Sequence, residues 1–288
     1  MTVRLGLAVA AAGVAVILTV SLAPQLKAAA LPADTERTVL FSAVDSKGVP
    51  IKDITAADLV VKENGKERAI ASVKPATDPF QIFVIVDDGG TGAFQAPVAQ
   101  FLQTMFGKGQ FAMTMLNPQP IKITDLTDDA NALRTAVGRL GQRGRITPDG
   151  EQIIGGVSDA ARALSAKKAA RPVIVVLSLS GEPAGSPRSQ EALNDVKAAN
   201  AILHVIFITG VETGQLLGDG PKQTGGVSLP ASTGVAIGPT LARVSDSLLN
   251  QYQLTYTLPD GVKPNEKFQL STSRKGVTLL APTRVPEK

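Results

Sequence analysis

The sequence predicts an α/β protein with a doubly wound, mainly parallel sheet, helices on both faces, and a small β unit made by its two ends. From residue 80 to 250, short continuous apolar runs alternate with helical apolar spacing, as in sheets whose crossovers are helices. Residues 34–75 and 251–285 instead alternate apolar and polar residues. The 288 residues are 44% hydrophobic but only 4% aromatic, which predicts an aliphatic core.

Residues 1–30 resemble an export segment. Arg4 precedes an apolar run from residue 5 to 23 that has no polar face, and Ala28–Ala30 offer the small residues that a signal peptidase needs. The run, roughly 19 residues long, is also just long enough to span a bilayer. We interpret it as a cleaved signal peptide, with a retained inner-membrane anchor as the alternative. Both predict an extracytoplasmic chain, periplasmic or secreted, that meets a membrane only through this segment.

Residues 34–75 are predicted to form strands and turns. Val39, Phe41 and Ala43 alternate with polar residues, which is the period of a half-buried strand. A second alternating run ends at Asn64-Gly65, the strongest short hairpin signal. This N-terminal segment is too short to hold a core alone.

The first half of the 80–250 domain shows two strands and three helices. Residues 81–86 and 111–116 are apolar runs suited to strands that are buried on both faces. Apolar side chains at helical spacing predict a helix over 94–106, with Phe106 on its buried face. Asp128-Asp129 are placed to cap the next helix. The apolar positions of the two later helices are Leu133, Val137 and Leu140, then Ile153, Ile154, Val157, Ala161 and Leu164.

In the second half, residues 173–177 and 202–208 are predicted strands, and Pro172 is suited to begin the first of them. A helix carrying Leu193 and Val196 lies between them. Residues 210–239 are rich in Gly, Thr and Ser and are predicted to be a long loop. We expect Thr240 to cap the last helix.

The C-terminal segment, residues 251–285, returns to strand patterns. Tyr252, Leu254 and Tyr256 alternate with polar residues, and further strands begin at Phe268 and after the turn at Gly276. We expect this segment to pack with residues 34–75 outside the α/β domain.

Several phrases, in this order along the chain, resemble the von Willebrand factor A family, and more narrowly an exported bacterial subgroup. The resemblance covers residues 38 to 281 and implies that fold, a protein-interaction role and no catalytic activity. The matching phrases are Asp45–Gly48, Leu59–Gly65, Asp87–Thr91 in place of Asp-x-Ser-x-Ser, Val175–Glu182 where Leu-Thr-Asp-Gly is frequent, Thr224-Gly225-Gly226, and Asn250–Tyr256.

Intact members of this family hold a divalent cation at an adhesion site. The resemblance places ligands at the first-strand Asp and two following hydroxyls, a Thr in the second loop and an Asp after the fourth strand. Asp87 and Thr91 keep two of these positions, but Gly89 has no side-chain oxygen and Ser180 or Leu179 replaces the last acid. Thr147 is an imperfect substitute for the loop Thr. Because such a cation needs about six oxygen ligands, we expect a degenerate site and no cofactor.

The loops 87–92, 147–152 and 180–187 are the predicted surface for an unidentified protein partner. In one alternative the site still binds Mg or Ca for adhesion, at Asp87 and Thr91, with Asp88 and Asp149 or Glu151 compensating. In another the chain is a structural envelope component. A purely structural role for Asp87 is to cap the following turn, whose glycines would need positive φ. The predicted binding residues are Asp87, Asp88, Gly89, Thr91, Thr147, Asp149 and Ser180.

The sequence lacks the motifs typical of nucleic-acid binding, of thiol chemistry and of catalysis. The formal net charge is +4, but no Lys/Arg cluster is interleaved with aromatics, which argues against nucleic-acid binding. The chain has no cysteine, which excludes disulfides and thiolate chemistry. His204, the only histidine, is predicted to be a core residue satisfied by a neighbour. Ser178 stands where a nucleophile elbow at Ser180 needs glycine, and Gln95 where a dinucleotide loop needs one.

Overall fold

The computed structural model describes residue 2 and residues 35–117, 119–141 and 150–285. The described residues from 35 onward belong to one compact unit. The predicted export segment, residues 1–30, lies outside the described residues except for Thr2, and its role therefore stays a prediction. In the part of the chain that is described, no helix has both the length and the apolarity needed to cross a membrane.

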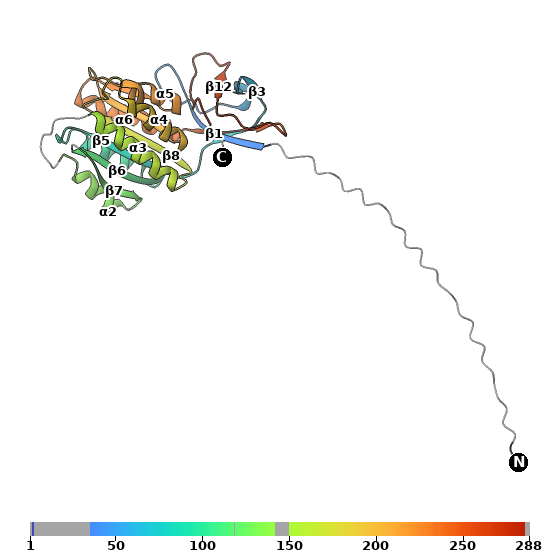
Figure 1. The fold of residues 1–288 in the computed structure, drawn as a ribbon, viewed down its shortest axis with the longest axis horizontal. Coiled ribbons are helices and arrows are strands. Elements are labelled where there is room, and N and C mark those ends of the chain that lie inside the picture. The colour runs from blue at the N-terminus through green and yellow to red at the C-terminus, as the bar shows by residue number, and fades with distance from the viewer. Residues whose placement is uncertain (1, 3–34, 118, 142–149, 286–288) are drawn as a thin grey trace. The chain divides into compact units, whose positions relative to one another are not determined.

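A six-stranded sheet forms the centre of the α/β domain (Figure 1), with the order β10-β9-β8-β5-β6-β7. All neighbouring pairs are parallel except β6 and β7. The four predicted strands are confirmed, but the two edge strands β7 and β10 were not predicted. In β7 the only buried side chain is that of Ile123. The bounds are β5 (Phe80–Asp87), β6 (Gly109–Asn117), β7 (Gln119–Thr127), β8 (Arg171–Ser178), β9 (Ile202–Ile208) and β10 (Ser228–Ala231).

Helices cover both faces of this sheet, which confirms the doubly wound fold. Helices α1 (Gln95–Met105), α2 (Ala130–Gly138) and α6 (Gly234–Leu249) share one apolar cluster with it. The other face packs against α3 (Gly150–Ala166), α4 (Pro187–Ala198) and the π-helical turn η2 (Gly214–Asp219), which α5 (Gly220–Thr224) follows. As predicted, Asp129 caps α2, accepting a hydrogen bond from the Ala132 N–H at 2.6 Å.

Three predictions in this domain are wrong. The supposed loop 210–239 contains η2, α5, β10 and the start of α6, because a few buried side chains such as Leu216 fix segments that are otherwise polar and glycine-rich. Thr240 lies inside α6, where its hydroxyl donates to the Ala236 carbonyl at 2.7 Å. Phe106 is 52% exposed, because α1 ends at Met105 and the backbone of Phe106 is extended.

The β unit combines both ends of the described chain. One antiparallel sheet has the order β13-β1-β11-β4 and a second has β12-β2-β3. Asn64 and Gly65 both have positive φ (49° and 74°), so they form the predicted two-residue hairpin. One apolar cluster joins both segments, including Phe41 and Tyr256. The bounds are β1 (Thr35–Val44), η1 (Ala56–Asp58), β2 (Leu59–Glu63), β3 (Lys66–Arg68), β4 (Ile70–Pro75), β11 (Tyr252–Leu258), β12 (Phe268–Thr272) and β13 (Thr278–Leu280).

A buried arginine joins the β unit to the six-stranded sheet. Arg171, at the start of β8, donates to the carbonyls of Ala76 and Leu248 and to the side chain of Gln251, and it stacks over Phe80 at 3.7 Å. Burial lowers its pKa to about 10. These contacts fix the two chain segments that cross from the β unit to the sheet.

Candidate binding site

The two loops of the predicted site lie side by side at the C-terminal edge of the sheet. Strands β5 and β8 are parallel neighbours, with Asp87 opposite Ser178 in the register. The chain runs from β5 to β6 and β7 on one side and returns to β8 on the other, so the strand order reverses between β5 and β8. Doubly wound sheets bind ligands at such a reversal.

Asp87 connects the two loops. Its side chain is 3% exposed, and Oδ2 accepts hydrogen bonds from the Ser178 hydroxyl at 2.8 Å and from the Ser180 N–H at 3.0 Å. The Ser180 hydroxyl donates to the same oxygen. The backbone carbonyl of Asp87 accepts from the Leu179 N–H at 2.8 Å. Asp87 therefore binds the loop after β8 and does not cap the turn after β5.

Asp88 has the capping role that the sequence assigned to Asp87. Its Oδ1 accepts from the Gly90 N–H at 2.9 Å and its Oδ2 from the Gly92 N–H at 2.8 Å. Its carbonyl accepts from the N–H and the hydroxyl of Thr91. As expected, Gly89, Gly90 and Gly92 all have positive φ (59°, 73° and 76°), which side chains rarely tolerate. The carboxylate of Asp88 is thus 3% exposed and directed into its own loop.

The structure brings together five of the predicted site residues and leaves two unplaced. Asp87, Asp88, Gly89, Thr91 and Ser180 belong to the paired loops. Thr147 and Asp149 lie outside the described residues. Glu151, considered as an approaching ligand, forms an ion pair with Arg188 at 3.7 Å.

Two functional residues were not predicted. Ser178, fully buried, donates to Asp87 and accepts from the Gly181 N–H at 2.9 Å. Glu182 is 2% exposed and accepts from the Leu216 N–H at 3.0 Å, the Leu217 N–H at 2.7 Å and the hydroxyl of Ser189. It therefore holds the π-helical turn η2 against this edge. The only sequence signal was an acid directly after Gly181, in the loop that follows a buried strand.

Close backbone packing in this region depends on Gly181. Its φ is +75°, and a Cβ there would lie 2.1 Å from the Glu212 carbonyl oxygen. The Glu182 N–H donates to that same carbonyl at 2.8 Å. The loop after β8 is thus held by β5 on one side and by the 211–217 segment on the other.

Most of the described carboxylate oxygens at this edge of the sheet already accept hydrogen bonds from the protein. Oδ2 of Asp87 already accepts from three protein donors, both carboxylate oxygens of Asp88 accept from loop amides, and Ser180 is neutral. Such a cation is held by several oxygens, usually including carboxylates. No group of three or more His, Asp or Glu residues in the described ranges is arranged to hold a metal ion.

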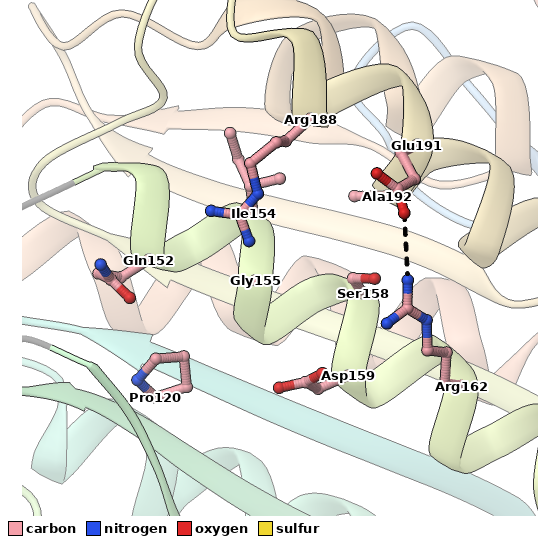
Figure 2. A pocket seen from close by; sticks show the side chains of 10 residues that line it. All are labelled: Pro120, Gln152, Ile154, Gly155, Ser158, Asp159, Arg162, Arg188, Glu191 and Ala192. Atoms are coloured by element: carbon pink, nitrogen blue, oxygen red, sulfur yellow. Dashed lines mark hydrogen bonds and ion pairs between the residues drawn. The ribbon is translucent and has the colours of Figure 1, made fainter.

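Apart from these loops, a polar hollow of about 300 Å³ lies between α3 and α4 (Figure 2). Arg162 points toward Glu191 and forms ion pairs with it at 3.4 Å and with Asp195 at 3.0 Å. Arg188 pairs with Glu151 at this hollow. At this hollow both arginines are therefore paired with acids of the same chain.

His204 is buried as expected, but its predicted hydrogen-bonding neighbour is absent. It is 1% exposed in β9, and neither ring nitrogen has a hydrogen-bond partner among the described residues. Burial lowers the pKa of the imidazole to about 4. It is therefore a neutral core side chain at neutral pH.

The fold is that of von Willebrand factor A-type domains. A von Willebrand factor type A protein from Catenulispora acidiphila superimposes with a TM-score of 0.51 at 12% identity, over 82% of this chain and 74% of that chain. Two further similar structures are an aerotolerance-related membrane protein from Bacteroides fragilis (TM-score 0.46, 9% identity, 59% and 98% covered) and the vWF domain of the type V pili tip protein Mfa5 from Porphyromonas gingivalis (0.45, 11%, 60% and 96%).

At these identities the likeness concerns the fold alone. No protein-family model and no curated protein matches the sequence. The resemblance stated from the sequence phrases is thus confirmed at the level of the fold.

Proposed function

We propose that this chain is an extracytoplasmic protein-interaction module that binds its partner without a metal ion and catalyses no reaction. The observation that carries the proposal is the hydrogen bonding of Asp87. Its carboxylate oxygen, where the family resemblance implies a metal ligand, accepts from the Ser178 hydroxyl and from the N–H and hydroxyl of Ser180. These three hydrogen-bond donors thus connect the two loops at the position where the resemblance implies a bound cation.

The proposed binding face is the C-terminal edge of the sheet around this contact. It is formed by the 87–92 loop, with Thr91 exposed, and by the loop that begins at Ser180. Thr147 and Asp149, outside the described residues, complete the face in the proposal. Backbone groups, serine hydroxyls and carboxylates would supply the contacts.

The proposed location is supported by the sequence of the N-terminal segment. The apolar run from residue 5 to 23, followed by Ala28–Ala30, has the organisation of a signal peptide. Export of the chain places the binding face in the periplasm or outside the cell.

Metal independence is tested by the melting temperature of residues 31–288, which contain the whole compact unit. The protein is measured with excess EDTA and then with millimolar Mg²⁺, Mn²⁺ or Ca²⁺. At a hundred times its dissociation constant, a bound ion would add about 2.7 kcal/mol. We expect no shift. A clear shift that disappears in Asp87→Ala would restore the metal-dependent adhesion alternative.

The binding face is tested by a matched pair of substitutions at exposed alanines. Ala93→Arg changes the loop after β5, and Ala71→Arg changes β4 in the β unit. Proteins captured from the cell envelope by the unmodified chain should be lost with the first variant and retained with the second. Capture that survives both would place the interface elsewhere, and absence of any captured protein would favour the structural envelope role.

A further inference from the structure

An apolar hollow of about 470 Å³ lies between α1 and α2, outside the loops described above. The apolar side chains at its wall include Leu102, Phe106, Leu133 and Val137, and Gln103 and Arg134 contribute polar atoms. Phe106 is 52% exposed at the end of α1. The large apolar side chains that are exposed elsewhere, such as Val235, do not line this hollow. One surface therefore carries both an exposed aromatic ring and a hollow.

The charges of α2 are separated along its length. Asp128 and Asp129 are exposed at its N-terminal end, whereas Arg134 is exposed in its middle and Arg139 directly after its last residue. One guanidinium nitrogen of Arg134 donates to Asn131 Oδ1 in the same helix, which leaves most of its five donors available. The helix lies beside the edge strand β7 (Figure 1), at a margin of the sheet.

We propose that this surface binds a second copy of the chain through a two-fold axis. In a two-fold interface the same patch serves both partners and must be complementary to itself. Antiparallel packing of α2 against its mate brings Asp128 of each copy toward Arg134 of the other, so opposite charges meet at both ends. Phe106 of each copy then covers the hollow of the other. A second copy of this chain is favoured as the partner because the same surface carries opposite charges on α2, the exposed ring of Phe106 and the hollow that this ring would cover.

The test measures the association of residues 31–288 by sedimentation equilibrium, from about 1 to 100 µM. We expect a monomer–dimer equilibrium in this range. Phe106→Ser should weaken association roughly tenfold or more, because buried aromatics dominate interface energies. Because the side chain of Phe106 is half exposed in the single chain, the melting temperature of the monomeric Phe106→Ser variant should hardly differ from that of the unmodified protein. Val235→Ser, at a side chain that is 88% exposed on α6, is the matched control and should leave association unchanged.

The charge pairing is tested by reversal. Arg134→Asp places like charges opposite each other and should weaken association to a similar extent. Adding Asp128→Arg to this variant should restore it, because the reversed pair attracts again. The proposal is overturned by a monomer at the highest concentration, by a dimer that Phe106→Ser does not weaken, or by failure of the double reversal to restore association.

Discussion

The C-terminal edge of the six-stranded sheet and the β unit both bury carboxylates, but they satisfy them in different ways. In the β unit, Glu63 is fully buried and pairs with Arg37 at 2.7 Å. Arg37 also donates to the carbonyls of Asn265 and Val285 at 2.8 Å. The ion pair joins β1 to β2, and the hydrogen bonds of Arg37 to the two carbonyls extend this contact to the last residues of the described chain.

At the sheet edge, backbone N–H groups and serine hydroxyls take the place of the arginine. Asp87, Asp88 and Glu182 are each at most 3% exposed and accept only such neutral donors in the contacts described above. Among the described residues, no Lys or Arg forms an ion pair with them. The comparison teaches that an ion pair joins the strands of the β unit, whereas at the C-terminal edge of the sheet three buried acids order the loops through hydrogen bonds from backbone N–H groups and serine hydroxyls.

The largest expected effect separates the two regions directly. Glu63→Gln removes the negative charge of a buried ion pair whose two partners are both shielded from water, so the free energy of unfolding should fall by about 3–5 kcal/mol. Urea denaturation at pH 7 measures the change. Asp53→Asn, which breaks the exposed ion pair with Arg274, is the control and should hardly move the midpoint. Equal effects of the two variants would show that Arg37 and Glu63 do not join the β unit as described.

The next effect tests the edge itself. Asp87→Ala removes the acceptor for the hydroxyls of Ser178 and Ser180 and for one N–H, so unfolding in EDTA should become easier by about 2–3 kcal/mol. Asp87→Asn keeps one acceptor oxygen and should lose roughly half as much. Unchanged or increased stability of Asp87→Ala in EDTA would show that these hydrogen bonds do not hold the two loops together.

The buried imidazole of His204, the only histidine of the chain, makes the stability of the sheet depend on pH between about 4 and 6.5. Its pKa in the folded state is about 4, below the ordinary value of 6.5, so the unfolded chain takes up the proton first. Stability from this group is complete above pH 6.5, falls with pH to about 4, and is constant below that. At pH 5 the loss should be about 2 kcal/mol.

His204→Leu isolates this contribution. Chemical denaturation at pH 7.5 and pH 5 should show a smaller loss of stability in the variant than in the unmodified protein, since carboxylates titrate equally in both. Identical losses would mean that the imidazole is hydrated or paired in solution.

The sequence predicts the features of the fold that depend on neighbouring residues, but not those that depend on contacts between residues far apart in the chain. Buried strands such as 81–86 and the Asn64-Gly65 hairpin were predictable, because apolar runs and turn chemistry act locally. The π-helical turn η2 was not, because it depends on a buried Glu182 that is 34 residues from Leu216 in the sequence. Asp87 and Ser180 were recognised as neighbours of one site from the family resemblance. The sequence did not show that Asp88 caps the turn after β5 while Asp87 accepts hydrogen bonds from the loop after β8. This depends on the directions of the two side chains, which only the structure gives.

The smallest expected effect concerns backbone crowding at the binding edge. Gly181 and Gly276 have the same φ of +75°, but a Cβ at Gly181 meets the Glu212 carbonyl at 2.1 Å, whereas at Gly276 it meets nothing within 4 Å. Replacing either by Ala costs the conformational strain of a positive φ, about 1 kcal/mol. The additional cost at Gly181 should be about 1–2 kcal/mol, because a backbone atom must move. Thermal denaturation of the two variants gives the difference. If the difference is near zero, the loop after β8 is free to shift, and the binding edge is less rigid than its hydrogen bonds to Asp87 and Glu182 imply.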